Sequence, residues 1–351
     1  MKEIHIQSDD AGQRLDKYLR RYLKSANDGF LYKMLRKKRI KLNGARAEGR
    51  EMLEPGDVIT MYLADETIAK FRGDVDRTGV AGESMGQSIK PLKPEEIVYE
   101  DRDILIINKP IGELSQKARP DDISINERML EYLRETGAWK QGDSYTPGIC
   151  NRLDRNTSGL VLAGKTLHGL RLLSELIRDR KIRKFYTAVV EGEFSETSIG
   201  NLSETKSNIE NVPPAESSYT NGGDSCSGWV HIDGYLSKDE RTNRVTIYNE
   251  PGEGRSRIRT AYRVTGVESR NGVTFSRLDI ELITGKTHQI RAHLSSIGHA
   301  LAGDRKYGSR FPAPYELQAY RVDFPTDERL NNTLSGKSIF LPQYLEKNAD
   351  M

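Results

Sequence analysis

Residues 151–160 read Asn-Arg-Leu-Asp-Arg-Asn-Thr-Ser-Gly-Leu, an aspartate between two arginines followed by small, turn-forming residues. The apolar run 160–163 comes directly afterwards and predicts a short buried strand. Positive charge beside a carboxylate favours its ionised form, so Asp154 is a candidate reactive group at the entrance to a strand. The alternative for this residue taken alone is a surface cluster of ion pairs.

The residues that follow match the sequence pattern of a phosphate-binding loop. Residues 159–166, Gly-Leu-Val-Leu-Ala-Gly-Lys-Thr, match G-x-x-x-x-G-K-[ST] in full. A phosphate cradle needs an irregular loop between a strand and a helix, whereas the four residues between these glycines are all apolar. We therefore interpret the string as a strand and reject nucleotide hydrolysis.

Two further segments carry polar groups suited to chemistry. Lys184-Phe185-Tyr186 places an aromatic hydroxyl on a predicted strand, and residues 285–294 form a basic loop that leads into a predicted helix over 287–297. Free N–H groups at the start of a helix suit anionic ligands. Each segment also has an ordinary structural interpretation, as a half-buried tyrosine or as histidines that order a loop.

Taken together, these segments resemble the RluA-type pseudouridine synthase family. The resemblance rests on Arg-Leu-Asp-x-x-Thr-Ser-Gly-Leu at 152–160 and Thr-Gly-Lys-Thr-His-Gln-Ile-Arg-x-His-Leu at 284–294. It also rests on Gly-His at 298–299, Gly-Asp at 303–304, Ile-Asn-Lys-Pro at 107–110 and Arg-Lys-Phe-Tyr at 183–186. The order and spacing of these motifs cover most of residues 95–325.

The resemblance implies isomerisation of specific uridines in RNA to pseudouridine, after the nucleotide is flipped out, without a cofactor or a metal. It implies catalytic roles for Asp154, for Arg291 as its ion-pair partner and for Tyr186, which would stack on the uracil. The implied substrate-binding residues, with Arg152 filling the vacated space, are Arg152, Asn108, Lys109, Thr157, His288 and Gln289. This sequence departs from the family at Asn151 and Gln318, where histidine is common, and none of the catalytic positions is affected.

The amino-terminal segment is strongly basic. Residues 14–50 contain 13 Lys or Arg against three acids, a balance of +10, so the rest of the chain must sum to −7 to give the net charge of +3. Such a concentration predicts a polyanion-binding surface, and the alternative is a solvated helical face. With Asn43-Gly44 and Gly56-Asp57, the segment is similar to the alpha-L RNA-binding module. The RNA-binding residues that it implies are Lys33, Arg36, Lys37, Lys38, Arg39 and Lys41.

Element patterns divide the chain into a small α/β RNA-binding domain over 1–64, a linker over 65–94 and a catalytic domain over 95–345. More strand than helix in the last predicts an α+β fold with a pseudouridine synthase-like mixed, largely antiparallel sheet. Residues 195–226 are rich in Ser, Asn, Thr and Gly and predict a mobile surface insertion. Family members generally have little or nothing that corresponds to it.

Composition excludes several other classes of protein. The mean hydropathy of −0.65 and the lack of an apolar run of about 18 residues argue against a membrane span. Two cysteines cannot stabilise a chain of 351 residues by disulfide bonds, and the start lacks the patterns of signal and transit peptides. We therefore expect a cytoplasmic protein.

We expect a monomer whose partner is RNA, with large-subunit ribosomal RNA first and tRNA second. Two alternatives are a non-catalytic RNA-binding or ribosome-assembly factor and, less favoured, a glycosidase, which would need two opposed carboxyl groups.

Overall fold

The computed structural model describes residues 1–6, 10–72, 89–141, 143, 145–193, 228–270 and 272–345. Its contacts divide the chain into two compact units. Unit 1 comprises Met1–Ile107, Ser115–Arg152 and Val161–Glu175, and unit 2 comprises Asn108–Leu114, Leu153–Leu160 and Leu176–Met351. Strands β6 and β8 each begin in one unit and end in the other.

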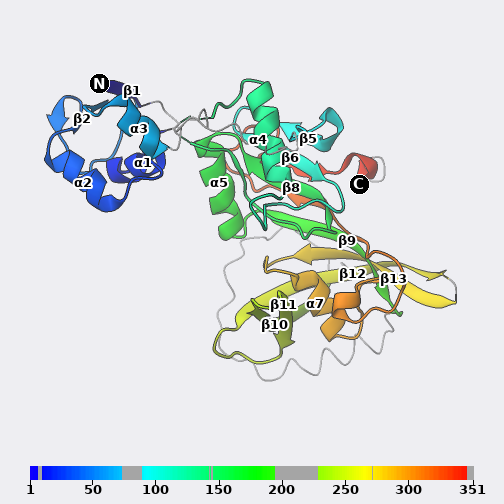
Figure 1. The fold of residues 1–351 in the computed structure, drawn as a ribbon. Helices are drawn as coiled ribbons and strands as arrows, with labels where there is room; N and C mark the ends of the chain where they lie inside the picture. The colour runs from blue at the N-terminus through cyan, green and yellow to red at the C-terminus, as the bar shows by residue number, and fades with distance from the viewer. Residues whose placement is uncertain are drawn as a thin grey trace. The chain divides into compact units, whose positions relative to one another are not determined.

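Residues 1–72 of unit 1 form a small module of helices on a four-stranded sheet (Figure 1, blue). Its elements are β1 (Lys2–His5), α1 (Leu15–Tyr22), α2 (Asp28–Arg36), β2 (Ile40–Leu42), β3 (Ala45–Arg46), β4 (Val58–Met61) and α3 (Asp65–Arg72). The strands follow the antiparallel order β1-β4-β2-β3. The small α/β fold that the sequence predicted for this part of the chain is therefore present.

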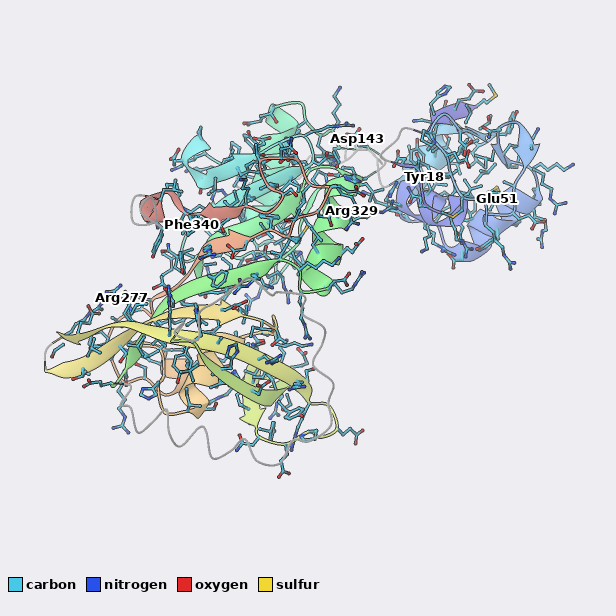
Figure 2. The ribbon with its side chains drawn as sticks, turned by 180° about the vertical axis from the view of Figure 1, so that it is seen from behind. Tyr18, Glu51, Asp143, Arg277, Arg329 and Phe340 are labelled. Carbon is cyan, nitrogen blue, oxygen red and sulfur yellow. The ribbon has the colours of Figure 1, made fainter. Side chains whose placement is uncertain are left out.

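Local chemistry explains these elements. Leu15, Tyr18 and Leu19 recur on one side of α1 and are fully buried, with Tyr18 inside the module (Figure 2). Asn27 caps α2 because its side-chain oxygen accepts a hydrogen bond from the Phe30 N–H at 2.8 Å. Residues 43–44 both adopt left-handed conformations, which the tight hairpin between β2 and β3 requires.

The predicted linker begins too early at residue 65. Residues 65–72 form α3, whose Ile68 belongs to the module's core. The Phe71 ring lies 4.3 Å from that of Phe30, between ring centres. Apolar residues at helical spacing therefore extend the module, and the rest of the predicted linker includes 73–88, outside the described residues.

The remainder of unit 1 contains strands with two covering helices. Its elements are η2 (Pro94–Glu96), β5 (Ile97–Glu100), β6 (Ile104–Lys109), α4 (Ile125–Glu135), β7 (Gly148–Ile149), β8 (Ser158–Gly164) and α5 (Leu167–Arg178). The strand order is β8-β6-β5, with β7 beside β8. The apolar run of the phosphate-loop string is strand β8, so the interpretation as a strand is confirmed.

Unit 2 is built on long antiparallel strands. Its elements are β9 (Arg183–Glu191), β10 (Val230–Asp239), β11 (Arg244–Tyr248), β12 (Ser256–Arg270), β13 (Val273–Leu282), α7 (Gln289–Ser296), η4 (Arg305–Tyr307), β14 (Leu317–Asp323), β15 (Ser338–Phe340) and η5 (Pro342–Tyr344). The order is β11-β10-β12-β13-β9-β14, and only the start of β8 joins β14 in parallel among the described pairs. The predicted α+β fold with a mixed, largely antiparallel sheet is confirmed.

The predicted insertion over 195–226 lies outside the described residues. Among the residues that are described, no helix has both the length and the apolar character that crossing a bilayer would require.

Candidate active site

Asp154 opens a tight turn at the entrance to β8. The Thr157 N–H donates to the Asp154 carbonyl at 3.0 Å, and β8 begins one residue later. Gly159 then lies at φ +114° against β14, where a Cβ atom would be 2.1 Å from the Ala319 carbonyl oxygen. Only glycine permits this close approach, which fixes the turn, and with it Asp154, to the sheet of unit 2.

The side chain of Lys109 is hydrogen-bonded to this turn. Its buried ammonium donates to the carbonyls of Pro110 at 2.9 Å, Glu113 at 2.8 Å and Arg155 at 3.2 Å. Burial lowers the pKa of Lys109 to about 8, against the opposing charges of Glu113 and Asp154. The family resemblance implied that Lys109 contacts the substrate, but its hydrogen bonds instead make it a buried link between two loops.

Arg291 reaches Asp154 from α7. Helix α7 packs on strands β10–β12 through Ala292, which shares a buried cluster with Leu236 and Ile258 (Figure 1). The next residue toward the N-terminus is Arg291, whose Nη1 donates to Asp154 Oδ2 at 2.9 Å. The predicted pairing of these two residues is therefore present, across 137 positions of sequence.

The rest of the Arg291 guanidinium is held by a residue to which sequence reasoning gave no role. Its Nε and Nη2 donate to Asp304 Oδ2 and Oδ1 at 2.7 and 2.9 Å. The rings of Tyr307 and Tyr315 lie with their centres 5.0 and 4.7 Å from the guanidinium carbon. Burial alone would lower the pKa of Arg291, but the hydrogen bonds and charge of Asp304 raise it, so the guanidinium stays charged.

His288 approaches the same oxygen of Asp154. It adopts a left-handed conformation (φ 52°) immediately before α7, and its Nε2 lies 3.9 Å from Asp154 Oδ2. Its Nδ1 lies 2.8 Å from the Tyr307 hydroxyl, which also accepts the Val245 N–H at 3.3 Å. With the Tyr307 hydroxyl as the donor to Nδ1, His288 would carry its proton on Nε2, the nitrogen that faces Asp154. Burial lowers the pKa of His288 against the charge of Asp154, which favours neutral imidazole.

Tyr186 lies on β9 opposite Ile280 of β13 and Ala319 of β14. Its side chain is buried. Burial raises the pKa of Tyr186 well above its ordinary value, and the negative charge of Asp154 adds to this effect. The phenol is therefore a neutral group within electrostatic reach of the carboxylate.

The other predicted substrate contacts differ in their exposure. Gln289 is buried and its amide is fully occupied, because it accepts from Thr284 and donates to Arg259 and Thr260. It orders the loop before α7. The remaining three are buried Thr157, half-buried Asn108 and Arg152, which is exposed and belongs to unit 1.

The predicted RNA-binding cations gather around the end of α2 and the start of β2. Lys33, Arg36, Lys37, Lys38 and Arg39 are exposed, and Lys41 is half-buried. Within the described ranges, no three His, Cys, Asp or Glu side chains gather as ligands for a metal ion.

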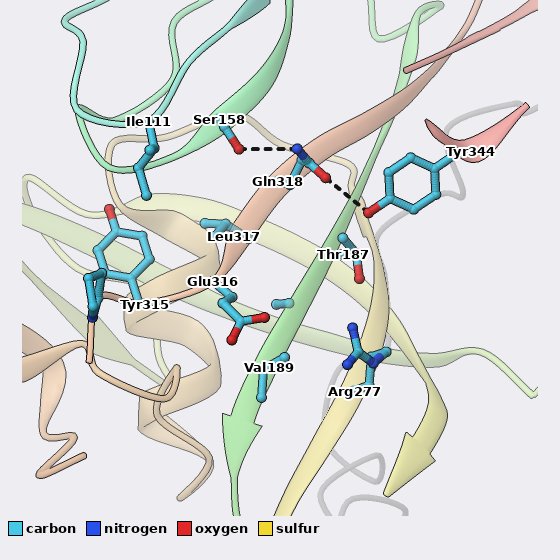
Figure 3. Close-up of a pocket in the computed structure, with 12 residues that line it drawn as sticks. Ile111, Ser158, Thr187, Val189, Arg277, Tyr315, Glu316, Leu317, Gln318 and Tyr344 are labelled. Carbon is cyan, nitrogen blue, oxygen red and sulfur yellow. Dashed lines mark hydrogen bonds between the residues drawn. The ribbon is translucent and has the colours of Figure 1, made fainter. Parts of the chain in front are cut away.

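A pocket of about 320 Å³ lies in unit 2 beside Tyr315 (Figure 3). Three of its lining residues form a hydrogen-bonded series, in which Tyr344 donates to Gln318 at 2.9 Å and Gln318 donates to Ser158 at 3.3 Å. Asp154, Tyr186 and Arg291 do not line it. We therefore do not assign the reacting group of a substrate to this pocket.

Comparison with known proteins identifies the family. The pattern of the RNA pseudouridylate synthase family matches residues 103–296, more than half of the chain. Ribosomal large subunit pseudouridine synthase C of Escherichia coli (strain K12) is 28% identical over 310 residues, which cover 88% of this chain and 81% of that protein. The protein of the same name from Haemophilus influenzae is 26% identical over 313 residues, 88% of this chain and 80% of that protein.

Among solved structures, human RNA Pseudouridylate Synthase Domain Containing 1 is similar at 23% identity with a TM-score of 0.47. The match covers 67% of this chain and 82% of the human chain. The family match agrees with the motifs at 107–110, 152–160, 183–186 and 284–294, all of which fall within its range. The chain therefore belongs to the RNA pseudouridylate synthase family, as its RluA-type motifs predicted, and is an RNA pseudouridine synthase.

Proposed function

We propose that this enzyme isomerises specific uridines of large-subunit ribosomal RNA, with Asp154 as its catalytic carboxylate. The observation that carries the proposal is the Arg291 Nη1 contact with Asp154 Oδ2 at 2.9 Å. The Asp154 side chain keeps 24% of its surface exposed, whereas Arg291 is buried behind it. An ionised, oriented and accessible carboxylate is what covalent or electrostatic catalysis at a sugar–base junction needs.

The chemistry is an isomerisation. The bond between ribose C1′ and uracil N1 breaks, the base turns, and C5 bonds to C1′. The C5 proton leaves and N1 takes one up, so atoms and electrons balance without an oxidant or reductant. Asp154 would act as the nucleophile or as the stabilising anion at C1′, and neutral Tyr186 would stack on the uracil and assist a proton transfer.

Access to a stacked base requires that the nucleotide be flipped out of the helix. We assign the filling of the vacated space to exposed Arg152, with Asn108, Thr157 and His288 near the flipped nucleotide. The exposed cations at the end of α2, within the proposed alpha-L module, would bind phosphates without regard to sequence.

The choice of substrate rests on the relatives. Proteins from Escherichia coli and Haemophilus influenzae that are similar over 88% of this chain are named as synthases of the ribosomal large subunit. A tRNA is the second candidate. We expect the protein to act in the cytoplasm and as a monomer.

The test is a map of pseudouridines in total cellular RNA from four strains. These carry the wild type, a deletion, Asp154→Ala, or Asp121→Ala, which removes an exposed carboxylate. We expect discrete ribosomal sites to vanish in the deletion and Asp154→Ala strains alone, and the purified Asp154→Ala enzyme to be at least about 10³-fold slower.

Other outcomes would redirect the proposal. Loss at tRNA sites would keep Asp154 and change the substrate. If Asp154→Ala modified every site normally, the catalytic assignment would be refuted. If neither deletion nor substitution changed the map but the deletion impaired ribosome assembly, a non-catalytic RNA-binding factor would replace the enzyme.

A further inference from the structure

The groups around Asp154 leave a negative charge at a site that must accept a polyanion. Arg291 carries one positive charge, and its two partners Asp154 and Asp304 carry one negative charge each, so one net negative charge remains. His288 does not offset this charge, because burial lowers its pKa and favours the neutral ring. A phosphate of the RNA beside Asp154 would therefore be repelled unless other cations lie close by.

Two cations near the site, Arg244 and Lys306, have no carboxylate partner. Arg244 begins β11 and is exposed, Lys306 lies in η4 and is half-buried, and neither pairs with an acid among the residues that the structure describes. Other arginines of the unit 2 sheet are instead neutralised, as in the pairs Arg183–Glu281, Arg263–Asp279 and Arg321–Asp323. Arg244 and Lys306 therefore keep their charge for an external anion.

The fold holds these two cations close to each other. Lys306 Nζ donates at 2.7 Å to the carbonyl of Asn243, the residue before Arg244. The Arg244 guanidinium carbon lies 5.8 Å from the centre of the Tyr307 ring, and the Tyr307 hydroxyl accepts the Val245 N–H at 3.3 Å. These contacts attach η4 to the start of β11, so neighbouring residues of two distant segments present their charges together.

Tyr307 also connects the two cations to the catalytic carboxylate. Its ring centre lies 5.0 Å from the Arg291 guanidinium carbon, so Arg244 and Arg291 contact one and the same ring. Burial and the charge of Arg291 lower the pKa of Lys306, against the opposing charge of Asp154. Lys306 therefore lies within electrostatic reach of Asp154, and Arg244 is separated from Arg291 by a single side chain.

From these contacts we propose that Arg244 and Lys306 together bind a backbone phosphate next to the target uridine. The inference rests on the proposed function, and it makes the β10–β11 hairpin part of the RNA-binding surface. When the nucleotide leaves its stack, its sugar must approach Asp154 and its phosphates move with it. Two cations that bind one of these phosphates offset the repulsion by Asp154 and hold the sugar beside the carboxylate.

The experiment measures the second-order single-turnover rate constant of the full-length enzyme on a synthetic RNA stem-loop. This RNA contains a uridine that the cellular map identifies as a site. The variants are Arg244→Gln/Lys306→Gln and the conservative pair Arg244→Lys/Lys306→Arg. Glutamine removes the charge at 306 but can still donate to the Asn243 carbonyl. The matched control is Lys181→Gln/Lys337→Gln, which removes equal charge at two exposed lysines of unit 2, and thermal unfolding checks that each variant is folded.

The double glutamine variant should be about 10- to 100-fold slower than the wild type, because charge-assisted hydrogen bonds to the phosphate are lost. The conservative pair should retain most of the rate, because both charges remain. The control should stay within about twofold of the wild type, as expected for surface substitutions that touch no ligand.

A change in the RNA then locates the contact. A methylphosphonate, which carries no charge, replaces the phosphate on the 5′ or the 3′ side of the target uridine. One of these two RNAs should slow the wild type by about the same factor as the double glutamine substitution. On that RNA the double glutamine variant should be little slower than the wild type, because both changes remove one contact.

Three results would overturn the inference. The first is a folded double glutamine variant within twofold of the wild type, and the second is equal slowing by the Lys181→Gln/Lys337→Gln control. The third is a wild type that neither methylphosphonate slows, or losses that multiply at both positions. In each case an inactive Asp154→Ala enzyme would leave the proposed function standing, whereas an active Asp154→Ala enzyme would refute that function itself.

Discussion

At the scale of single residues, Lys109 offers a test of how a buried charge supports the site. Its pKa falls from 10.5 to about 8 on folding. Between these values the unfolded chain binds more protons than the folded chain, so this group makes stability rise with pH across that window. In Lys109→Met three carbonyls lose their donor, and we expect the free energy of unfolding to fall by about 1–3 kcal/mol at neutral pH.

Urea unfolding at about pH 7 and about pH 10 measures both effects. The stability difference between wild type and Lys109→Met should widen as the pH rises. Lys117→Met, at an exposed lysine of the next loop, should change stability by less than about 0.5 kcal/mol at either pH. A difference that narrows with pH would show that burial does not lower the pKa of Lys109.

Residue roles were predictable where a motif names them and unpredictable where a role depends on a contact across the fold. The expected pairing of Asp154 with Arg291 is present. The fork on Asp304 and the ring of Tyr315 were not foreseen, since a sequence pattern does not show which side of a guanidinium each neighbour occupies. Gln289 was predicted to bind substrate, but it is buried and its amide forms hydrogen bonds that order the loop before α7.

At the scale of elements, Gly159 joins the catalytic turn to the sheet. In Gly159→Ala the new methyl group would meet the Ala319 carbonyl at 2.1 Å, so β8 and β14 would have to separate. We expect a loss of stability above about 3 kcal/mol or an insoluble protein, together with lost activity. Thermal unfolding and the modification rate of total RNA from the deletion strain are the measurements.

The matched control is Gly254→Ala. Gly254 also has a left-handed backbone, at φ 70°, but no atom lies within 4 Å of the place that an alanine methyl group would take there. This variant isolates the backbone strain, about 1 kcal/mol, from the clash. Equal losses in the two variants would mean that close packing on β14 is not what requires glycine at 159.

The strand predicted from the apolar run 160–163 was predictable because the run is continuous, and it forms the middle of β8. Helix α7 was expected from residue 287 and begins at Gln289, because His288 adopts a left-handed conformation there. Helix α4 was not foreseen, although Ser124 and Glu127 form a capping box that could have marked its start. Its apolar residues are separated by charges, which weakens the periodic signal.

At the scale of the whole molecule, the fold class was predictable from the excess of strands, whereas the end of the first module was not. Few apolar residues stand in 65–72, but Ile68 and Phe71 suffice to bury α3 against the module's core. Sequence distinguishes a linker from a short amphipathic helix poorly when two side chains decide the difference.

The basic amino-terminal segment makes the final prediction. Lys33 and Lys37 are exposed on and just after α2, and replacing both with glutamine should weaken RNA binding while leaving the single-turnover rate at saturating RNA unchanged. Each lost phosphate contact reduces the slope of log K against log salt by about 0.7–0.9, so two should reduce it by about 1.5. The control is Lys24→Gln/Lys70→Gln, which removes equal charge at exposed lysines elsewhere in the same module. Equal slopes for both double variants would indicate that only net charge matters, whereas a smaller slope for Lys33→Gln/Lys37→Gln alone would locate the phosphate contacts on the surface around α2.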